Sequence, residues 1–240
     1  MQEGSRIHRM IQRRMGSEYQ AEVSLRYTHP TEDYRLVLEG RADGVIDRPE
    51  GVTIDEIKGT YRELAYMKEP VPVHLAQAKV YAAMFLHRHP DRELPGIQVQ
   101  MTYCHMETEE IRYFNYSYTN RELQEWFGGV IRSYLKWADY QFQWKRKRDV
   151  SIRQLEFPFP YREGQKELVT YVYQTIYHEK KLFLEAPTGV GKTVATVFPA
   201  VKAMERGMGQ EEINLTDKTI TRTVAENNFD LLREQGLSFK

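Results

Sequence analysis

A short glycine-containing segment at residues 186–193, APTGVGKT, restricts the fold of the C-terminal part of the chain. The apolar run 181–185 (KLFLE) precedes it, and the amphipathic stretch 192–206 follows it. A strand, a tight glycine turn and a helix in this order bring backbone N–H groups to a helix N-terminus, where they can bind phosphate oxygens. The segment therefore predicts an α/β fold in which this turn, a P-loop, binds a nucleotide.

The predicted nucleotide site draws on the turn and on a segment upstream of it. Lys192 would reach the β- and γ-phosphates of ATP, and the Thr193 hydroxyl would hold Mg²⁺. Upstream, the amide of Gln165 suits pairing with adenine N6 and N7, although an ordinary linker and helix cap would also explain that segment. The candidate nucleotide-binding residues are Arg162, Gln165, Thr188, Gly189, Val190, Gly191, Lys192 and Thr193.

The residues around the turn continue the α/β pattern. We expect a helix at 163–178, a second strand at 212–216 and a helix at 219–235, which would begin a parallel sheet. Residues 215–222 (LTDKTITR) place hydroxyl and basic groups at a helix N-terminus, where they suit contacts to a nucleic-acid backbone. No apolar strand ending in Asp-Glu follows Thr193, so the Walker B pair is missing and we expect ATP hydrolysis to be inefficient.

Residues 1–150 show the pattern of a separate α/β module. We expect residues 151–160 to be a linker, because prolines flank an aromatic residue there without periodicity, and residues 161–240 to begin the nucleotide-binding domain. Hydrophobic periodicity and turn signals predict the order α-β-β-β-α-β-β-α within the first module. Its predicted elements are helix 5–15, strands 21–29, 34–47 and 52–58, helix 73–88, strands 97–105 and 110–118, and helix 120–147.

Two acidic residues in the predicted strands of this module are placed to bind a metal ion. Asp43 interrupts an apolar run. Strand alternation puts Glu56 and Lys58 on one face of the next strand, with Asp55 on the other. Asp43 and Glu56 from neighbouring strands could converge on Mg²⁺ or Mn²⁺, which prefer oxygen ligands and can activate water. Lys58 beside them would stabilise developing charge.

Two predicted helices add further candidates. His8 could supply a nitrogen ligand, which suits Mn²⁺ better than Mg²⁺. Gln77 and Tyr81 lie at i and i+4 on helix 73–88 and could reach the DNA backbone or Lys58. Each of these residues alone is also compatible with an ordinary surface position. As a set, the catalytic candidates are Asp43, Glu56, Lys58, Gln77 and Tyr81, and the metal-ligand candidates are His8, Asp43, Glu56 and Thr193.

The composition narrows the classes of protein and cofactor. Lys and Arg together number 34, as do Asp and Glu, so binding to nucleic acid would depend on local basic patches. The single cysteine, Cys104, cannot form a four-cysteine iron–sulfur cluster within this chain. No apolar run reaches the roughly 18 residues of a membrane span, and residues 1–15 are too polar for a secretory signal. We therefore expect a soluble cytoplasmic protein with no membrane partner.

These motifs resemble two known families. His8, Asp43, Glu56, Lys58 and the Gln77/Tyr81 pair resemble the motifs of RecB-like PD-(D/E)xK nucleases of the restriction-endonuclease type. Residues 157–240 resemble the start of a superfamily 2 helicase motor of the DinG/XPD type, with the P-loop as the most specific part. Together these resemblances imply a bacterial DNA helicase whose N-terminal module is a metal-dependent nuclease.

The resemblance carries expectations about cofactors, partners and completeness. It implies ATP and Mg²⁺ or Mn²⁺ as cofactors, single-stranded DNA as the partner, and a role in DNA repair or processing. It also implies a complete RecA-like helicase domain, of which this chain holds only the beginning, and an iron–sulfur domain beyond Lys240. In addition, Met1 opens directly into a helix-like stretch and Lys240 follows a helical pattern with no closing element, so we expect the chain to be truncated at both ends.

Two alternatives remain open at this point. In the first, the N-terminal module is a non-catalytic DNA-binding clamp, and only the helicase is an enzyme. In the second, the P-loop belongs to an unrelated kinase or transferase, and the N-terminal module binds a small molecule.

Overall fold

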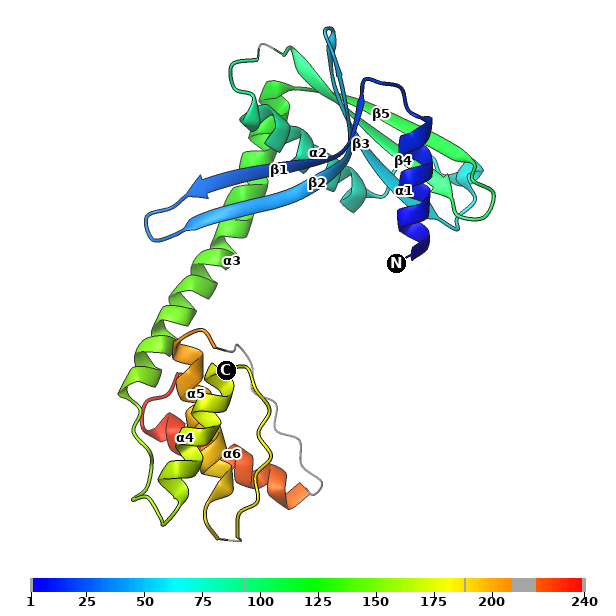
Figure 1. Cartoon of the computed structure of the whole chain (residues 1–240). Coiled ribbons are helices and arrows are strands. Elements are labelled where there is room, and N and C mark those ends of the chain that lie inside the picture. Colours follow the sequence, from blue (N-terminus) through cyan, green and yellow to red (C-terminus); the bar gives the residue numbers. More distant parts are fainter. Residues whose placement is uncertain (1, 93, 188, 209–218, 239–240) are drawn as a thin grey trace. The chain divides into compact units, whose positions relative to one another are not determined.

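The computed structural model describes residues 2–92, 94–187, 189–208 and 219–238 of the chain. These residues form two units that fold around separate cores, residues 1–134 and residues 135–240 (Figure 1). The first unit contains the candidate metal ligands His8, Asp43 and Glu56, and the second contains the glycine turn and Thr193.

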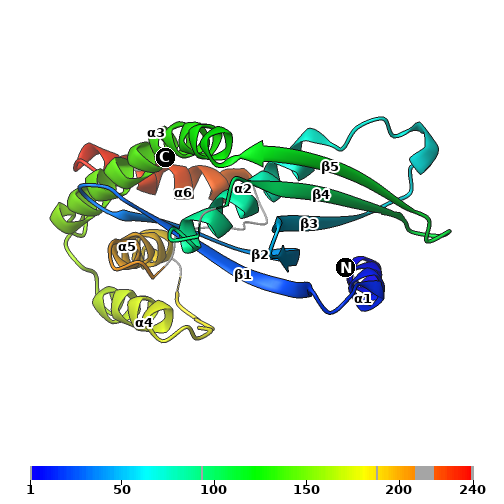
Figure 2. The ribbon, with the colours of Figure 1, turned by 90° about the horizontal axis from the view of Figure 1, so that it is seen from above.

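A five-stranded sheet organises the first unit. Its strands are β1 (Tyr19–Pro30), β2 (Arg35–Arg48), β3 (Gly51–Thr60), β4 (Gly96–His105) and β5 (Ile111–Thr119). They lie side by side in chain order, as Figure 2 shows from above, and only the β3–β4 pair is parallel. A parallel pair needs a crossover connection, which is supplied by a short 3-10 turn (Leu64–Tyr66) and helix α2 (Pro72–Arg88). The predicted mixed α/β character and the order of elements in this unit are confirmed.

Helices α1 (Gln2–Arg14) and α2 cover opposite faces of this sheet. Ile7 and Ile11, one turn apart on α1, are buried against Ile57 of β3 and Cys104 of β4. Lys58, which follows Ile57 in the strand, instead donates a hydrogen bond to Gln77 of α2. Successive residues of a strand point to opposite faces, so the predicted alternation in β3 is confirmed.

Helix α3 (Asn120–Gln154) extends further than its sequence pattern indicates. The predicted helix ended at residue 147 and the predicted linker began at residue 151, but residues 151–154 are helical, so this part of the linker prediction is wrong. The physical reason is Ile152, which is fully buried in the core of the second unit together with Leu155. No helix in the described part of the chain, α3 included, is both long and apolar enough to span a membrane.

The described part of the second unit is helical. It comprises the end of α3 with α4 (Gln165–Tyr177), α5 (Lys192–Glu205) and α6 (Thr219–Glu234), close to the three helices predicted from the sequence. Apolar side chains from α3, α5 and the C-terminal region meet in one core. Its buried members are Ile152, Leu155, Val197, Phe198, Val201, Met204, Leu232 and Leu237.

The predicted strand at residues 181–185 is wrong. These residues have no regular secondary structure, and the side chain of Phe183 at their centre is 94% exposed. A strand is stable only when a neighbouring strand satisfies its backbone groups. The predicted neighbour, 212–216, lies outside the described residues. Among the residues that are described, the second unit therefore contains no strand, and the expected parallel sheet is not formed by them.

Candidate functional site

Asp43 lies where strands β2 and β3 stop pairing. Their register runs from Arg48 opposite Gly51 to Gly44 opposite Asp55 and goes no further. At the next position, Oδ2 of Asp43 accepts the backbone N–H of Ile57 at 2.8 Å, in place of a carbonyl of the ladder. Oδ1 of the same carboxylate is 3.1 Å from Nδ1 of His8 on α1. Asp43 is thus held by a strand on one side and by a helix on the other.

The two carboxylate oxygens of the buried Glu56 have different surroundings. Its side chain is only 2% exposed, and Oε1 forms an ion pair with Nζ of Lys58 at 2.7 Å. The other oxygen, Oε2, is buried and has no hydrogen-bond partner among the described residues. Burial, followed by the nearby charge of Asp43, raises the pKa of Glu56 to about 7. Burying a carboxylate oxygen without a partner is costly in free energy. Coordination of a divalent cation would offset this cost.

The adjacent acid, Asp55, has the opposite environment. Its carboxylate is fully buried on the other face of β3 and accepts hydrogen bonds from Tyr19, Gln100 and Thr102. Burial nevertheless raises the pKa of Asp55 above its usual value. Asp55 is fully buried, has three protein donors and lies on the face of β3 opposite Glu56, so its role is structural, and this position agrees with its predicted separation from Glu56.

Gln77 and Tyr81 connect helix α2 to Lys58. Nζ of Lys58 donates to Oε1 of Gln77 at 3.1 Å, and Nε2 of Gln77 donates to the Tyr81 hydroxyl at 3.2 Å. The Tyr81 ring lies against Gly40 of β2, where an added Cβ would be 2.5 Å from the ring. Of the pair predicted from its i, i+4 spacing, Gln77 is therefore in direct contact with Lys58, and Tyr81 is connected to the lysine through Gln77. Gly40 makes room for the Tyr81 ring.

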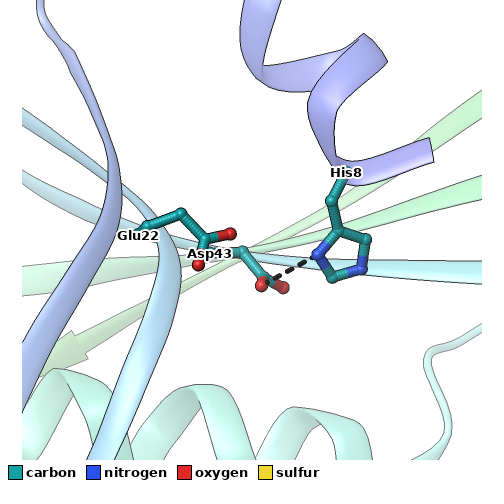
Figure 3. A group of neighbouring side chains, drawn as sticks. All are labelled: His8, Glu22 and Asp43. Carbon is teal, nitrogen blue, oxygen red and sulfur yellow. Dashed lines mark ion pairs between the residues drawn. The ribbon is translucent and has the colours of Figure 1, made fainter. Parts of the chain in front are cut away.

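His8, Asp43 and Glu22 point toward a common space (Figure 3). One ligand atom from each lies within 4.8 Å of the others, an arrangement that could hold a metal ion. Gln12 of α1 donates to Oε1 of Glu22 and to the carbonyl of Asp43, and so ties the group to the helix. The hydrogen bond to Asp43 raises the pKa of His8. A metal ion would need the neutral form of this imidazole, so its binding would release a proton.

Glu22 was missed by the sequence analysis. It lies in β1 with a φ of 57°, a left-handed conformation that is uncommon for a residue other than glycine. No glycine or asparagine marks this position, and regular alternation along β1 does not foresee the turn of the backbone. Its carboxylate also forms an ion pair with Arg41 at 2.6 Å. In the register of β1 and β2, Glu22 lies between the pairs Ala21–Gly44 and Val23–Ala42, in the same interval as Asp43 of the opposite strand.

The glycine turn of the second unit is held by two of the predicted upstream residues. Nε2 of Gln165, which is 2% exposed, donates to the carbonyl of Val190 at 2.9 Å. Its Oε1 accepts the backbone N–H of Arg162, whose guanidinium in turn donates to the carbonyl of Gly189. Gly191 has a φ of 78°, and an added Cβ would be 2.5 Å from the Gln165 amide. Arg162 and Gln165 thus fasten the turn, while the predicted contact with adenine stays a prediction.

Lys192 and Thr193 begin helix α5, as the P-loop pattern predicts. The ammonium of Lys192 folds over the turn and donates to the carbonyls of Ala186 at 2.9 Å and Pro187 at 3.0 Å. Thr188 lies outside the described residues, as do residues 215–218 of the predicted nucleic-acid contact and the side chains of residues 219–222.

Comparison with known proteins relates part of the chain to a helicase. No protein-family model matches the sequence. Over 70 residues, 29% of this chain, it is 37% identical to a probable ATP-dependent helicase of Methanocaldococcus jannaschii. The match covers 10% of that protein, so this chain spans about a tenth of its length. The chain is therefore related to a helicase over part of its sequence.

A solved structure, the crystal structure of SSO0001, aligns with 48% of this chain and 50% of its own, at 15% identity and a TM-score of 0.37. This likeness is too low to support a conclusion about fold or function.

Proposed function

We propose that residues 1–150 are a RecB-like, metal-dependent DNA nuclease module and that residues 161–240 begin an ATP-dependent DNA helicase motor of the DinG/XPD type, joined by a linker that ends near residue 160. The observation that carries the nuclease proposal is the buried, unpartnered Oε2 of Glu56 beside Lys58 and within the electrostatic influence of Asp43. The partial similarity to a probable helicase supports the second half.

The donor set fits a hard divalent cation. His8, Glu22 and Asp43 form the group whose ligand atoms lie within 4.8 Å of one another, and Glu56 is not a member of it. In this proposal Glu56 adds its unpartnered Oε2, which gives a mixture of oxygen and nitrogen donors that suits Mn²⁺ and is compatible with Mg²⁺. When bound, such an ion would neutralise charge on the phosphodiester and lower the pKa of a water molecule that attacks it. Thr193 would hold Mg²⁺ with the nucleotide in the second unit.

The side chains of the chain itself have distinct tasks in this proposal. Asp43 is fixed in position because the Ile57 N–H holds Oδ2, while His8 holds Oδ1 in the metal-free protein. Lys58 presents an ammonium that stabilises the negative charge developing on the phosphate. Gln77, supported by Tyr81, orients that ammonium and so acts as a positioning residue.

We expect Asp43→Asn to bind Mn²⁺ at least tenfold more weakly than the native chain and to lose cleavage of linear single-stranded DNA, because one ligand oxygen becomes an amide. Isothermal titration calorimetry with Mn²⁺ measures the first effect, and a gel assay of labelled DNA measures the second.

The matched control for this experiment is Asp47→Asn. Asp47 lies on the same strand, and its carboxylate is engaged by Arg92 outside the site, so native binding and native cleavage are expected. Equal Mn²⁺ affinity in the native and Asp43→Asn proteins would contradict the metal site. DNA binding without any Mn²⁺ binding or cleavage would instead support a non-catalytic clamp.

The helicase half of the proposal predicts nucleotide binding. We expect Lys192→Ala to weaken binding of a fluorescent ATP analogue about tenfold, because this ammonium is the charge that contacts the β- and γ-phosphates. Binding is the correct measurement here, since no Asp-Glu strand follows Thr193 in this chain. Lys180→Ala, at an exposed position after α4, removes the same charge and should bind as the native protein does. Equal affinities of the two variants would contradict the P-loop assignment.

A further inference from the structure

Helix α1 presents three different surfaces around its circumference. Ile7 and Ile11 are buried on the sheet. His8 and Gln12 form a second stripe at i and i+4, and both contact Asp43. Each of these two site residues is followed directly by an arginine, and the side chains of Arg9 and Arg13 are exposed to solvent. The arginines therefore form a third stripe, which lies about 100° around the helix axis from His8 and Gln12.

Arg6 and Arg14 add to the positive charge around the arginine stripe of Arg9 and Arg13. A depression of about 380 Å³ is lined by Arg6, Arg9, Met10, Arg13 and Arg14. Among the residues that the structure describes, one carboxylate, that of Glu109, pairs with these four arginines, and it is shared by Arg6 at 2.5 Å and Arg14 at 3.4 Å.

Arg9 and Arg13 keep their charge uncompensated. Nε of Arg9 donates to the carbonyl of Ser5, a neutral acceptor. Within the described part of the chain, neither Arg9 nor Arg13 lies within ion-pair distance of a carboxylate. A guanidinium without a carboxylate, next to a site proposed to cut phosphodiesters, is suited to a phosphate group.

We propose that Arg9 and Arg13 bind the phosphate backbone of a DNA strand and hold it against the His8–Asp43 site. Residues at i and i+4 of a helix are separated by about 6 Å along its axis, so the two guanidiniums can contact successive positions of one strand. The contacts are to phosphates and carry no base specificity. The inference rests on the proposed nuclease for the identity of its substrate, but the binding itself needs neither metal nor cleavage.

The test measures binding of the full chain to a fluorescein-labelled single-stranded DNA in EDTA, by fluorescence anisotropy over a series of salt concentrations. We expect the double variant Arg9→Gln/Arg13→Gln to bind about tenfold more weakly. The slope of log affinity against log salt should become shallower by about 1.4, because each single-strand phosphate contact contributes about 0.7. Circular dichroism verifies that the variant is folded.

A second double variant, Arg121→Gln/Arg132→Gln, controls for net charge. It removes the same two charges from exposed positions on α3, so its affinity and salt slope should remain native. An equal loss of affinity in both double variants would overturn the inference, as would an unchanged salt slope in Arg9→Gln/Arg13→Gln. The inference also fails if this variant loses binding to anionic phospholipid vesicles or to RNA while its DNA affinity stays native.

The failure of this inference can be distinguished from failure of the proposed nuclease. Asp43→Asn should bind DNA in EDTA with native affinity while losing cleavage. If Asp43→Asn still cleaves DNA, the nuclease site is wrongly assigned, although the arginine stripe can still bind DNA. If cleavage depends on Asp43 but DNA binding is indifferent to Arg9 and Arg13, the nuclease stands and the arginine stripe does not.

Discussion

Lys58→Met is expected to slow DNA cleavage by about a thousandfold without weakening Mn²⁺ binding. The ammonium of Lys58 is 2.7 Å from Oε1 of Glu56 and is oriented by Gln77, so it is placed to stabilise charge and not to hold a cation. Its removal also frees a carboxylate oxygen, which favours a divalent ion. Single-turnover cleavage at saturating Mn²⁺ measures the rate, and calorimetry measures the affinity.

Two further variants make this result interpretable. Lys136→Met, at an exposed position on α3, removes the same charge and should cleave at the native rate. Gln77→Ala leaves the ammonium in place but unguided, so its rate should lie between those of the native and Lys58→Met proteins. A native cleavage rate in Lys58→Met would show that the lysine has no catalytic role.

The second large effect concerns pH and the metal-free protein. We expect its free energy of unfolding to fall as the pH rises from about 5 to about 8, with Glu56 contributing about 3 kcal/mol of the decrease. The folded pKa of Glu56 is raised from 4.5 to about 7, so the folded state binds this proton more tightly than the unfolded chain does. The stabilisation is complete below about pH 4.5 and is lost as the pH passes through 7.

Other groups titrate over the same pH range, so the contribution of Glu56 must be isolated by a variant. The pKa values of His8 and Asp55 are also raised, and their protonation likewise favours the folded state. The pKa values of His74 and His87 are lowered by burial, and these two residues therefore act in the opposite direction to Glu56. Urea denaturation of the native protein and of Glu56→Gln at several pH values gives the difference. Glu125→Gln, an exposed glutamate on α3, is the matched control and should show the native pH dependence.

Metal binding should reverse this loss of stability. Mn²⁺ replaces the proton at the carboxylates, so it should stabilise the native protein more at about pH 8 than at about pH 5, and should stabilise Glu56→Gln less. If the native and Glu56→Gln proteins lose stability in parallel as the pH rises, Glu56 does not titrate as its surroundings indicate.

The face of a strand or helix on which each site residue lies was predictable from the regular geometry of that element. Alternation along β3 correctly separated Glu56 and Lys58 from Asp55, because the period of a strand is fixed by its backbone. The i, i+4 spacing of Gln77 and Tyr81 likewise foretold one helical face. The strand period and the helical i, i+4 spacing apply wherever the strand or helix forms, and both form in the first unit.

Other features depend on contacts between residues far apart in the sequence. The left-handed φ of Glu22 is set by the surroundings of β1 and has no local signal. Burial of Ile152 in the second core extends α3 beyond the point where its own periodicity fades. The apolar residues of 181–185 suggested a strand, but the backbone N–H and C=O groups of a strand need hydrogen-bond partners on a neighbouring strand.

The hydrogen bond between Asp43 and the Ile57 N–H gives this side chain a structural role in addition to the metal-binding role that we propose for it. An asparagine at residue 43 keeps a carbonyl oxygen that can accept that N–H, whereas an alanine leaves the amide with nothing to bind. Inactivation and collapse are therefore separable in this molecule. In the proposed nuclease, Asp43→Asn would therefore lose cleavage while the sheet stays paired, and the folded variant would still be able to bind DNA.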